Sequence, residues 1–303
     1  MTYFAAGSAL LLVVGISLTI GWRPLIGPRA RPLTNRKFES SPQRLARGKY
    51  LVEAVGGCKT CHAPRDGTKH DAPILPGREG AGQFIDLKGL PGYIYAPNLT
   101  PDPDTGIGTW SDDALARAIR EGIGHDGRTL FPMMPYRQLS QLSDEDVASI
   151  VVFLRSLPPV RNPLPPTQIE FPINYLIRVV PQPVTEPIPA PDLSGPVKRR
   201  RYLAAIAACG DCHTPMKQGR PLPGLQYSGG QIFEGPWGRV ASANITPDPS
   251  GISYYDETTF IQVMRTGYVK ARVINQIMHH VDNTEPPMLC KLCGASHGAG
   301  NSN

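Results

Sequence analysis

Two short runs of cysteine and histidine are the residues of this chain whose types and spacing could do chemistry. They are Cys58-Lys-Thr-Cys61-His62 and Cys209-Gly-Asp-Cys212-His213. In each run the two cysteines present both sulfurs to one edge of a flat ligand, and the adjacent histidine offers an imidazole nitrogen over its face. This arrangement is typical of c-type haem attachment, with two thioether bonds and one axial iron ligand.

A Cys-x-x-Cys pair without the histidine is also found in thioredoxin-like redox couples and in zinc sites. Two complete copies in matching surroundings favour haem attachment instead. We therefore predict two covalently bound haem c groups. The predicted attachment cysteines and first axial ligands are Cys58, Cys61, His62, Cys209, Cys212 and His213.

A six-coordinate haem iron needs a second axial ligand, and methionine is the ligand that raises its potential. Met133 and Met134 stand before Pro135, and we favour Met134 because a residue directly before proline is held extended. In the second copy Met278 lies eleven residues beyond Gly267, as Met134 lies twelve beyond Gly122. We predict Met134 and Met278 as iron ligands.

The second half departs from the first after Met278. His279 and His280 follow it directly, and either could bind the iron in its place, or the position could be vacant or hold water. No acidic-capped helix follows Met278 in the sequence, so the second haem domain lacks a closing helix like the one that begins at Ser143 in the first half. We expect that a segment has been lost, or that the surface it would cover is buried against a partner or against the first domain.

An internal repeat supports two tandem domains. Asn98-Leu-Thr-Pro-Asp-Pro in the first half is echoed by Asn244-Ile-Thr-Pro-Asp-Pro in the second. Each copy leads into a predicted helix, over 111–121 with Ser111 as N-cap and over 256–266 with Asp256 as N-cap. Glycine at 122 and at 267 ends these helices.

Helical signals also flank the first haem motif. Ser41-Pro42 predicts a helix start, and Gly56-Gly57 predicts its end just before Cys58. A second helix is predicted from Ser143, with three acidic residues in its first turn and an apolar stripe, ending at Pro158-Pro159. The chain from 158 to 196 is rich in proline, and we expect its apolar patch, 171–180, to pack between the two domains.

The amino-terminal run from Tyr3 to Trp22 is uncharged and apolar, and is about as long as the roughly 20 residues that cross a bilayer. We expect an uncleaved transmembrane helix, with a cleaved signal peptide as the alternative. The net charge of +6 is concentrated behind this run, because residues 1–50 hold eight Lys and Arg against Glu39. The remainder holds 23 basic and 24 acidic side chains, so binding of nucleic acid is not expected.

These boundaries give five segments, which are 1–41 (transmembrane anchor and basic spacer), 42–158 (first haem domain), 159–197 (linker), 198–280 (second haem domain) and 281–303 (tail). The tail holds Cys290, Cys293 and His297, which could contribute three zinc ligands, form a disulfide or remain loose thiols. His70 and His125 lie in glycine-rich polar loops, where we expect them to be solvated.

The chain resembles the class I dihaem cytochromes c, in particular the cytochrome subunits of bacterial membrane-bound alcohol and sugar-acid dehydrogenases. The first haem motif, the Asn98 loop, Met134-Pro-Tyr and the helix after it carry the resemblance, which covers about residues 44–278. It implies a mostly α fold of two tandem cytochrome c domains with long loops. It also implies haem domains that face the periplasm from the bacterial inner membrane, although the basic residues after the apolar run favour the opposite orientation.

Two functional classes follow. In the first, the protein is an electron carrier that takes electrons from a periplasmic or membrane-bound dehydrogenase and passes them to the respiratory chain, with no catalytic residue of its own. In the second, it is a haem enzyme such as a dihaem peroxidase or a sulfur-compound oxidoreductase, with an open or displaceable position at the second haem. The methionine candidate in each domain favours the carrier.

Overall fold

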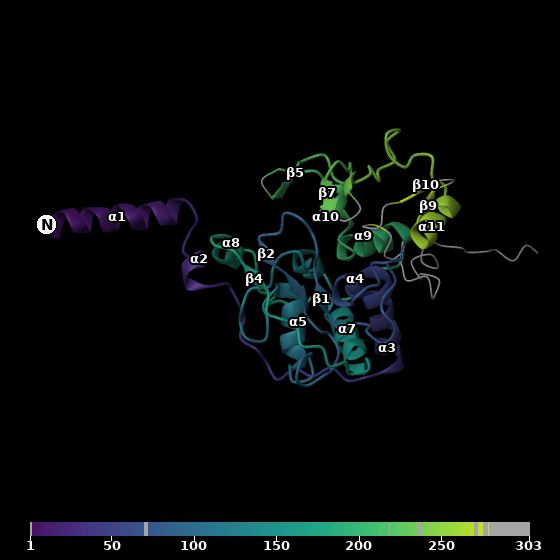
Figure 1. Ribbon diagram of the computed structural model, residues 1–303, viewed down its shortest axis with the longest axis horizontal. Helices are drawn as coiled ribbons and strands as arrows, with labels where there is room; N and C mark the ends of the chain where they lie inside the picture. The colour runs from purple at the N-terminus through teal and green to yellow at the C-terminus, as the bar shows by residue number, and fades with distance from the viewer. Residues whose placement is uncertain are drawn as a thin grey trace, which may run out of the picture.

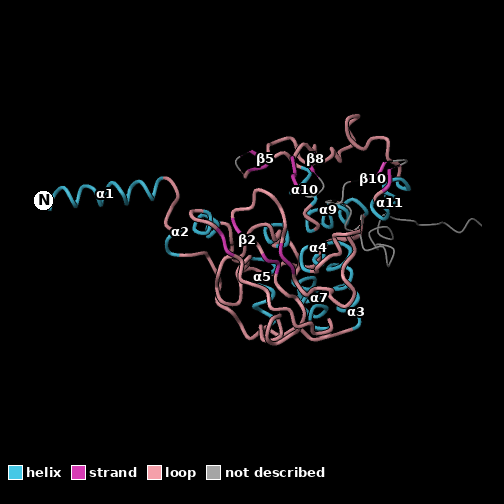
Figure 2. The backbone as a smooth tube through the Cα atoms, in the orientation of Figure 1, coloured by secondary structure: helices cyan, strands magenta, loops and turns pink. Residues whose placement is uncertain are grey.

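A computed structural model describes residues 2–69, 72–217, 219–235, 238–269, 272–274 and 278. The described chain is mostly helical, with long loops and short two-stranded antiparallel sheets (Figure 2). The helices of the first half are α1 (Thr2–Leu18), α2 (Arg23–Ile26), α3 (Pro42–Lys49), a π-helix (Tyr50–Val55), α4 (Cys58–His62), α5 (Asp112–Glu121), α6 (Tyr136–Leu139) and α7 (Asp144–Ser156). The helices of the second half are α8 (Ile173–Leu176), a 3-10 helix (Ile177–Val179), α9 (Pro196–Ile206), α10 (Cys209–His213) and α11 (Glu257–Thr266).

The strands pair locally rather than forming a common sheet. In the first half β1 (Gln83–Phe84) pairs with β3 (Tyr95–Ala96), and β2 (Gly92–Tyr93) pairs with β4 (Gln168–Ile169). The second-half strands are β5 (Met216–Lys217), β6 (Arg220–Pro221), β7 (Ile232–Gly235), β8 (Gly238–Ala241), β9 (Tyr268–Val269) and β10 (Arg272–Val273). They form three hairpins in sequence order.

The first domain is built on the crossing of α3 and α7. At this crossing the two backbones approach so closely that a Cβ on Gly48 would lie 2.0 Å from the Ser149 carbonyl oxygen. Only glycine fits there. The buried faces of the π-helix that follows α3, of α5 and of α7 form the apolar core, which includes Leu51, Leu115 and Val151. This core is the framework that supports the first haem motif.

The predicted helix signals are confirmed where the structure describes them. The side chains of Ser41, Ser111, Ser143 and Asp256 each accept a hydrogen bond from a backbone N–H in the first turn of the helix that follows. Gly122 and Gly267 end α5 and α11 with φ of 73° and 70°, in the left-handed region that favours glycine. The helix that begins at Pro42 continues as a π-helix to Val55, and Gly57 separates it from α4.

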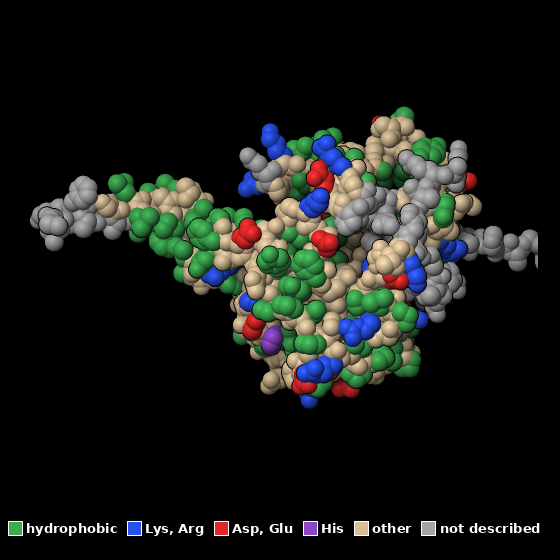
Figure 3. All heavy atoms as spheres, in the orientation of Figure 1, with side chains coloured by type: hydrophobic (Ala, Val, Ile, Leu, Met, Phe, Trp, Pro, Cys, Tyr) green, Lys and Arg blue, Asp and Glu red, His purple; other side chains and the backbone are tan. Residues whose placement is uncertain are grey.

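The predicted transmembrane helix over Tyr3–Trp22 is not supported. Helix α1 covers 17 residues and ends at Leu18, and the left-handed Gly21 (φ 68°) then turns the chain into α2. In the described part of the chain, no helix is long and apolar enough to cross a membrane. The described apolar side chains of α1, such as Leu11 and Leu18, are exposed, and the helix projects from the body of the protein (Figures 1 and 3).

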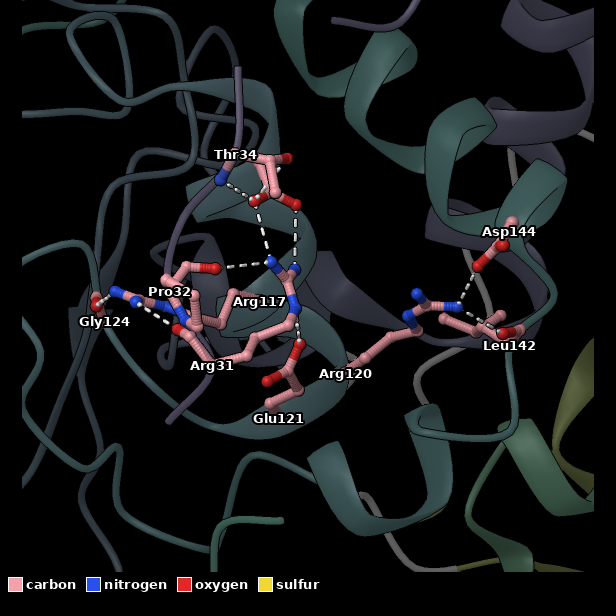
Figure 4. Close-up of polar contacts among 10 residues, drawn as sticks. Arg31, Pro32, Thr34, Arg117, Arg120, Glu121, Gly124, Leu142 and Asp144 are labelled. Carbon is pink, nitrogen blue, oxygen red and sulfur yellow. Dashed lines mark hydrogen bonds and ion pairs between the residues drawn. The ribbon is translucent and has the colours of Figure 1, made fainter. Parts of the chain in front are cut away.

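The basic spacer is tied to the first domain by buried ion pairs. The Arg31 guanidinium donates two hydrogen bonds to the Asp113 carboxylate at 2.7 and 2.8 Å, and its Nε donates to Glu121 at 2.8 Å (Figure 4). The backbone N–H of Thr34 also donates to Asp113. The same view shows hydrogen bonds of two arginines of α5. Arg117 donates to the Gly124 carbonyl oxygen, and Arg120 donates to Asp144 at the start of α7.

These contacts give a stability prediction. The side chains of Asp113 and Glu121 are fully buried, so Arg31→Ala would leave two buried carboxylates without this partner. Breaking a buried ion pair in this way costs about 3 kcal/mol of unfolding free energy. Urea unfolding followed by circular dichroism would measure it, with the exposed Lys37→Ala as a control that removes the same charge from the same segment. An equal effect of the two substitutions would contradict the role of Arg31.

Candidate haem site

The first Cys-x-x-Cys-His motif opens onto a cavity of about 700 Å³. Cys58, Cys61 and His62 lie along its wall, where α4 begins directly after Gly57. Most of the other lining side chains are apolar, and α5, α6, α7 and the loop before α6 are among the elements that contribute them. A cavity of this size and character, with two thiols and an imidazole on one wall, suits a flat apolar cofactor that is attached through sulfur.

His62 is held in the form that binds iron. The residue is 8% exposed, and its Nδ1 donates a hydrogen bond to the Pro97 carbonyl oxygen over 2.8 Å. Because a carbonyl oxygen only accepts, this bond places the proton on Nδ1 and leaves the Nε2 lone pair available to bind a metal. Burial also lowers the pKa of His62, which keeps the ring neutral. Burial raises the pKa of the Cys58 thiol to about 12, unlike the lowered values of reactive thioredoxin-like cysteines.

Both candidate methionines line the same cavity. Met134 also packs against the core of the first domain. Two backbone hydrogen bonds hold residues 131–136, the methionine strap, in place. Met134 N–H donates to the Phe131 carbonyl oxygen, and Tyr136 N–H donates to the Met134 carbonyl oxygen. The buried Tyr136 ring lies against Gly122, where a Cβ would come within 2.6 Å of the ring. Met134 therefore stays our predicted ligand, and Met133 stays the alternative.

The cavity also has polar groups that match the carboxylates of a haem. Thr129 Oγ1 and Asn174 Oδ1 are buried and have no hydrogen-bond partner within the described residues, and both residues line the cavity. Arg178 lines it too, with its guanidinium 4.3 Å from the centre of the Tyr175 ring. Haem carries two propionates, so the Thr129 hydroxyl and the Arg178 guanidinium suit them as hydrogen-bond donors, whereas the Asn174 Oδ1 can only accept a hydrogen bond. The residues present thus fit haem c.

We did not predict Asn174 and Arg178 as cavity residues from the sequence, because they belong to the linker. We expected the apolar patch 171–180 to pack between the two domains. Instead α8 and the 3-10 helix after it pack against α2 and form one wall of the first cavity. A signal for this role was present, because Arg178 is the one charged residue in the patch Phe171–Val180.

The second motif repeats the local geometry of the first. Ala208, with φ of 55°, takes the place of Gly57 before α10. His213 is 8% exposed, and its Nδ1 donates to the Ala243 carbonyl oxygen over 2.7 Å. The His213 carbonyl oxygen accepts from Gly229 N–H, just as the His62 carbonyl oxygen accepts from Gly82 N–H.

The repeated loops match as well. The Asn98 side chain accepts hydrogen bonds from the backbone and hydroxyl of Thr100, and Asn244 does the same for Thr246. The backbone N–H of Ile107 and of Ile252 then closes each loop onto the threonine carbonyl oxygen. The repeat seen in the sequence is therefore a repeat of structure.

The remaining candidate ligands are placed as follows. Met278 is 40% exposed, and its neighbours 275–277 and 279–280 lie outside the described residues, so its role stays a prediction. His279, His280 and His70 lie outside them too, as does the tail with Cys290, Cys293 and His297. His125 is exposed and packs its ring on Trp110, with ring centres 4.2 Å apart.

Comparison with known proteins agrees with this site. The model of the cytochrome c family matches residues 45–158. A protein described as a diheme cytochrome c-type from Cereibacter sphaeroides is 32% identical over 253 residues, which cover 80% of this chain and 78% of that protein. The chain therefore belongs to the cytochrome c family.

Two other relatives are longer than the region that matches. The fructose dehydrogenase cytochrome subunit of Gluconobacter japonicus is 31% identical over 252 residues, covering 79% of this chain and 48% of that protein. One of the subunits of the nicotinate dehydrogenase of Pseudomonas putida is 32% identical over 229 residues, covering 73% of this chain and 18% of that protein. The chain thus spans half or less of the length of these two relatives.

Proposed function

We propose that this chain is a dihaem electron carrier that takes electrons from a dehydrogenase and passes them to the respiratory chain. The observation that carries the proposal is the repeated motif, in which a buried histidine bonded to a backbone carbonyl follows two cysteines in both halves. Bound haem supplies a one-electron ferrous and ferric couple. The chain holds the imidazole, excludes water with apolar walls and offers a methionine at the first site.

The relatives support a dehydrogenase as the electron donor. Two of them are named as subunits of dehydrogenases, one for fructose and one for nicotinate, and the fructose relative is its cytochrome subunit. We propose that this chain also works beside a dehydrogenase, whose substrate is set by that partner. We further propose that the haem domains lie in the bacterial periplasm, because c-type haem is attached outside the inner membrane. Cell fractionation followed by haem staining would test this location.

A haem enzyme is the second candidate function, and the exposure of the Met278 side chain supports it. A side chain that is 40% exposed is a weaker candidate for a permanent ligand than one that lines a closed cavity. An iron without a protein ligand at this position binds exogenous molecules. In that case the second site would have a position for substrate.

Carbon monoxide binding to the purified, fully reduced protein separates the two functions. A carrier with both irons six-coordinate should give a visible spectrum that carbon monoxide leaves unchanged, and it should be oxidised and reduced reversibly over repeated cycles. A spectral change that corresponds to one of two haems would contradict the simple carrier and support a substrate position at the second site.

A further inference from the structure

The first helix of the second domain is packed into the first domain. Leu203 and Ile206 of α9 are buried in the same apolar cluster as Leu139, the last residue of α6, and Leu142, in the loop between α6 and α7. Ile206 also lines the cavity of the first haem site. The wall of the first site is therefore completed by a residue of the second domain.

Polar contacts fix how α9 sits on the first domain. The Tyr202 hydroxyl donates to the Asp146 carboxylate over 2.6 Å and accepts from the Ser143 backbone N–H. Asp146 is also held by Arg47, whose guanidinium donates to both carboxylate oxygens at 2.7 and 2.8 Å. Burial raises the pKa of Tyr202, so the hydroxyl stays protonated and able to donate. The contact therefore joins α9 to both helices of the α3–α7 crossing.

A second contact links the two haem sites directly. Gln138 lies in α6, four residues after Met134, and its side-chain amide donates a hydrogen bond to the Asp211 carboxylate. Asp211 stands between Cys209 and Cys212, inside the second attachment motif. On its other side, the Asp211 carbonyl oxygen accepts from the Gln231 side chain. One hydrogen bond thus connects α6, which begins at the end of the methionine strap of the first site, to the attachment helix of the second.

We infer that Gln138 and Asp211 are positioning residues that hold the second haem-attachment helix against the methionine strap of the first, so that electrons exchange directly between the two sites. This inference rests on the proposed function. Such an exchange reduces one iron as it oxidises the other and needs no proton or third reactant. Its rate depends on the distance and orientation of the two sites, which this hydrogen bond sets locally on top of the packing of α9.

The packing of α9 also bears on the missing closing helix of the second domain. From the sequence we expected that a segment has been lost, or that the surface it would cover is buried against a partner or against the first domain. Leu203 and Ile206 of α9 are buried against apolar side chains of the first domain. Helix α9 of the second domain is therefore supported by the first domain.

The test is the rate of electron exchange between the two haems after a brief pulse of reductant that is too small to reduce both. Gln138→Glu places two carboxylates in the contact and removes the hydrogen bond between residues 138 and 211. Because one hydrogen bond to a charged group is worth about a factor of ten in an equilibrium, we expect the exchange to slow about tenfold. The double variant Gln138→Glu with Asp211→Asn exchanges the amide and the carboxylate. It should recover most of the wild-type rate.

Gln141→Ala is the matched control, because Gln141 is an exposed glutamine in the same segment. It should exchange electrons at the wild-type rate, and haem content shows that each variant is assembled. If Gln138→Glu carries two haems and exchanges electrons as fast as Gln141→Ala, the inference is overturned while the proposed function stands. A wild-type chain with a single haem would overturn both.

Discussion

Replacing both Cys58 and Cys61 by alanine should remove covalent haem from the first domain and lower the haem content from two per chain to one. The two thiols are the only attachment points on the described wall of the first cavity, so the cofactor would be held by His62 and packing alone. A ligand that binds the folded state contributes to its stability, so the first domain should also unfold at lower denaturant concentration. Haem per chain after denaturation measures the first effect.

The matched variant is Cys209→Ala with Cys212→Ala. It should lose the second haem and keep the first, because the motifs are equivalent in local structure. The spectrum of each double variant should therefore be that of the remaining site. If either double variant kept two covalent haems, the attachment assignment would be wrong.

Met134→Ala should leave the haem attached and lower the reduction potential of the first site by about 0.2 V, a modest part of the roughly 0.8 V over which axial ligands tune haem iron. Thioether ligation favours the ferrous state, and water or a foreign ligand in its place does not. A potentiometric titration measures the shift. The ferric methionine-to-iron absorption band of the first site should disappear with it.

Met133→Ala is the control, since Met133 lines the same cavity and is the same type of residue. We expect it to keep the band and most of the potential. If Met133→Ala loses both and Met134→Ala keeps them, the ligand of the first haem is Met133. If neither substitution changes the spectrum, methionine does not ligate the first haem.

Much of the local structure was predictable because its causes lie within a few residues. Ser111 and Asp256 cap their helices through a hydrogen bond to a backbone N–H three residues on, and Gly122 and Gly267 end them. The two Cys-x-x-Cys-His motifs share their spacing and their local structure. The Asn98 and Asn244 loops repeat in the same way.

The parts that sequence reasoning missed depend on contacts between distant segments. The linker patch forms a cavity wall because α8 reaches α2 and the first domain, and nothing near Asn174 or Arg178 in the sequence specifies that partner. Arg31 meets Asp113 across 82 positions. The docking of Gln138 on Asp211 spans 73 positions. The transmembrane prediction is not supported, because α1 ends at Leu18.

The most direct test of this account is the mass of the intact native protein after denaturation and removal of loosely bound groups. Haem c survives this treatment because thioether bonds hold it. We predict the mass of the polypeptide, as it is processed in the cell, plus two haem groups, with tryptic peptides carrying them at Cys58–Cys61 and at Cys209–Cys212. A polypeptide that carries one haem or none would contradict the central claim that the chain is a dihaem cytochrome c.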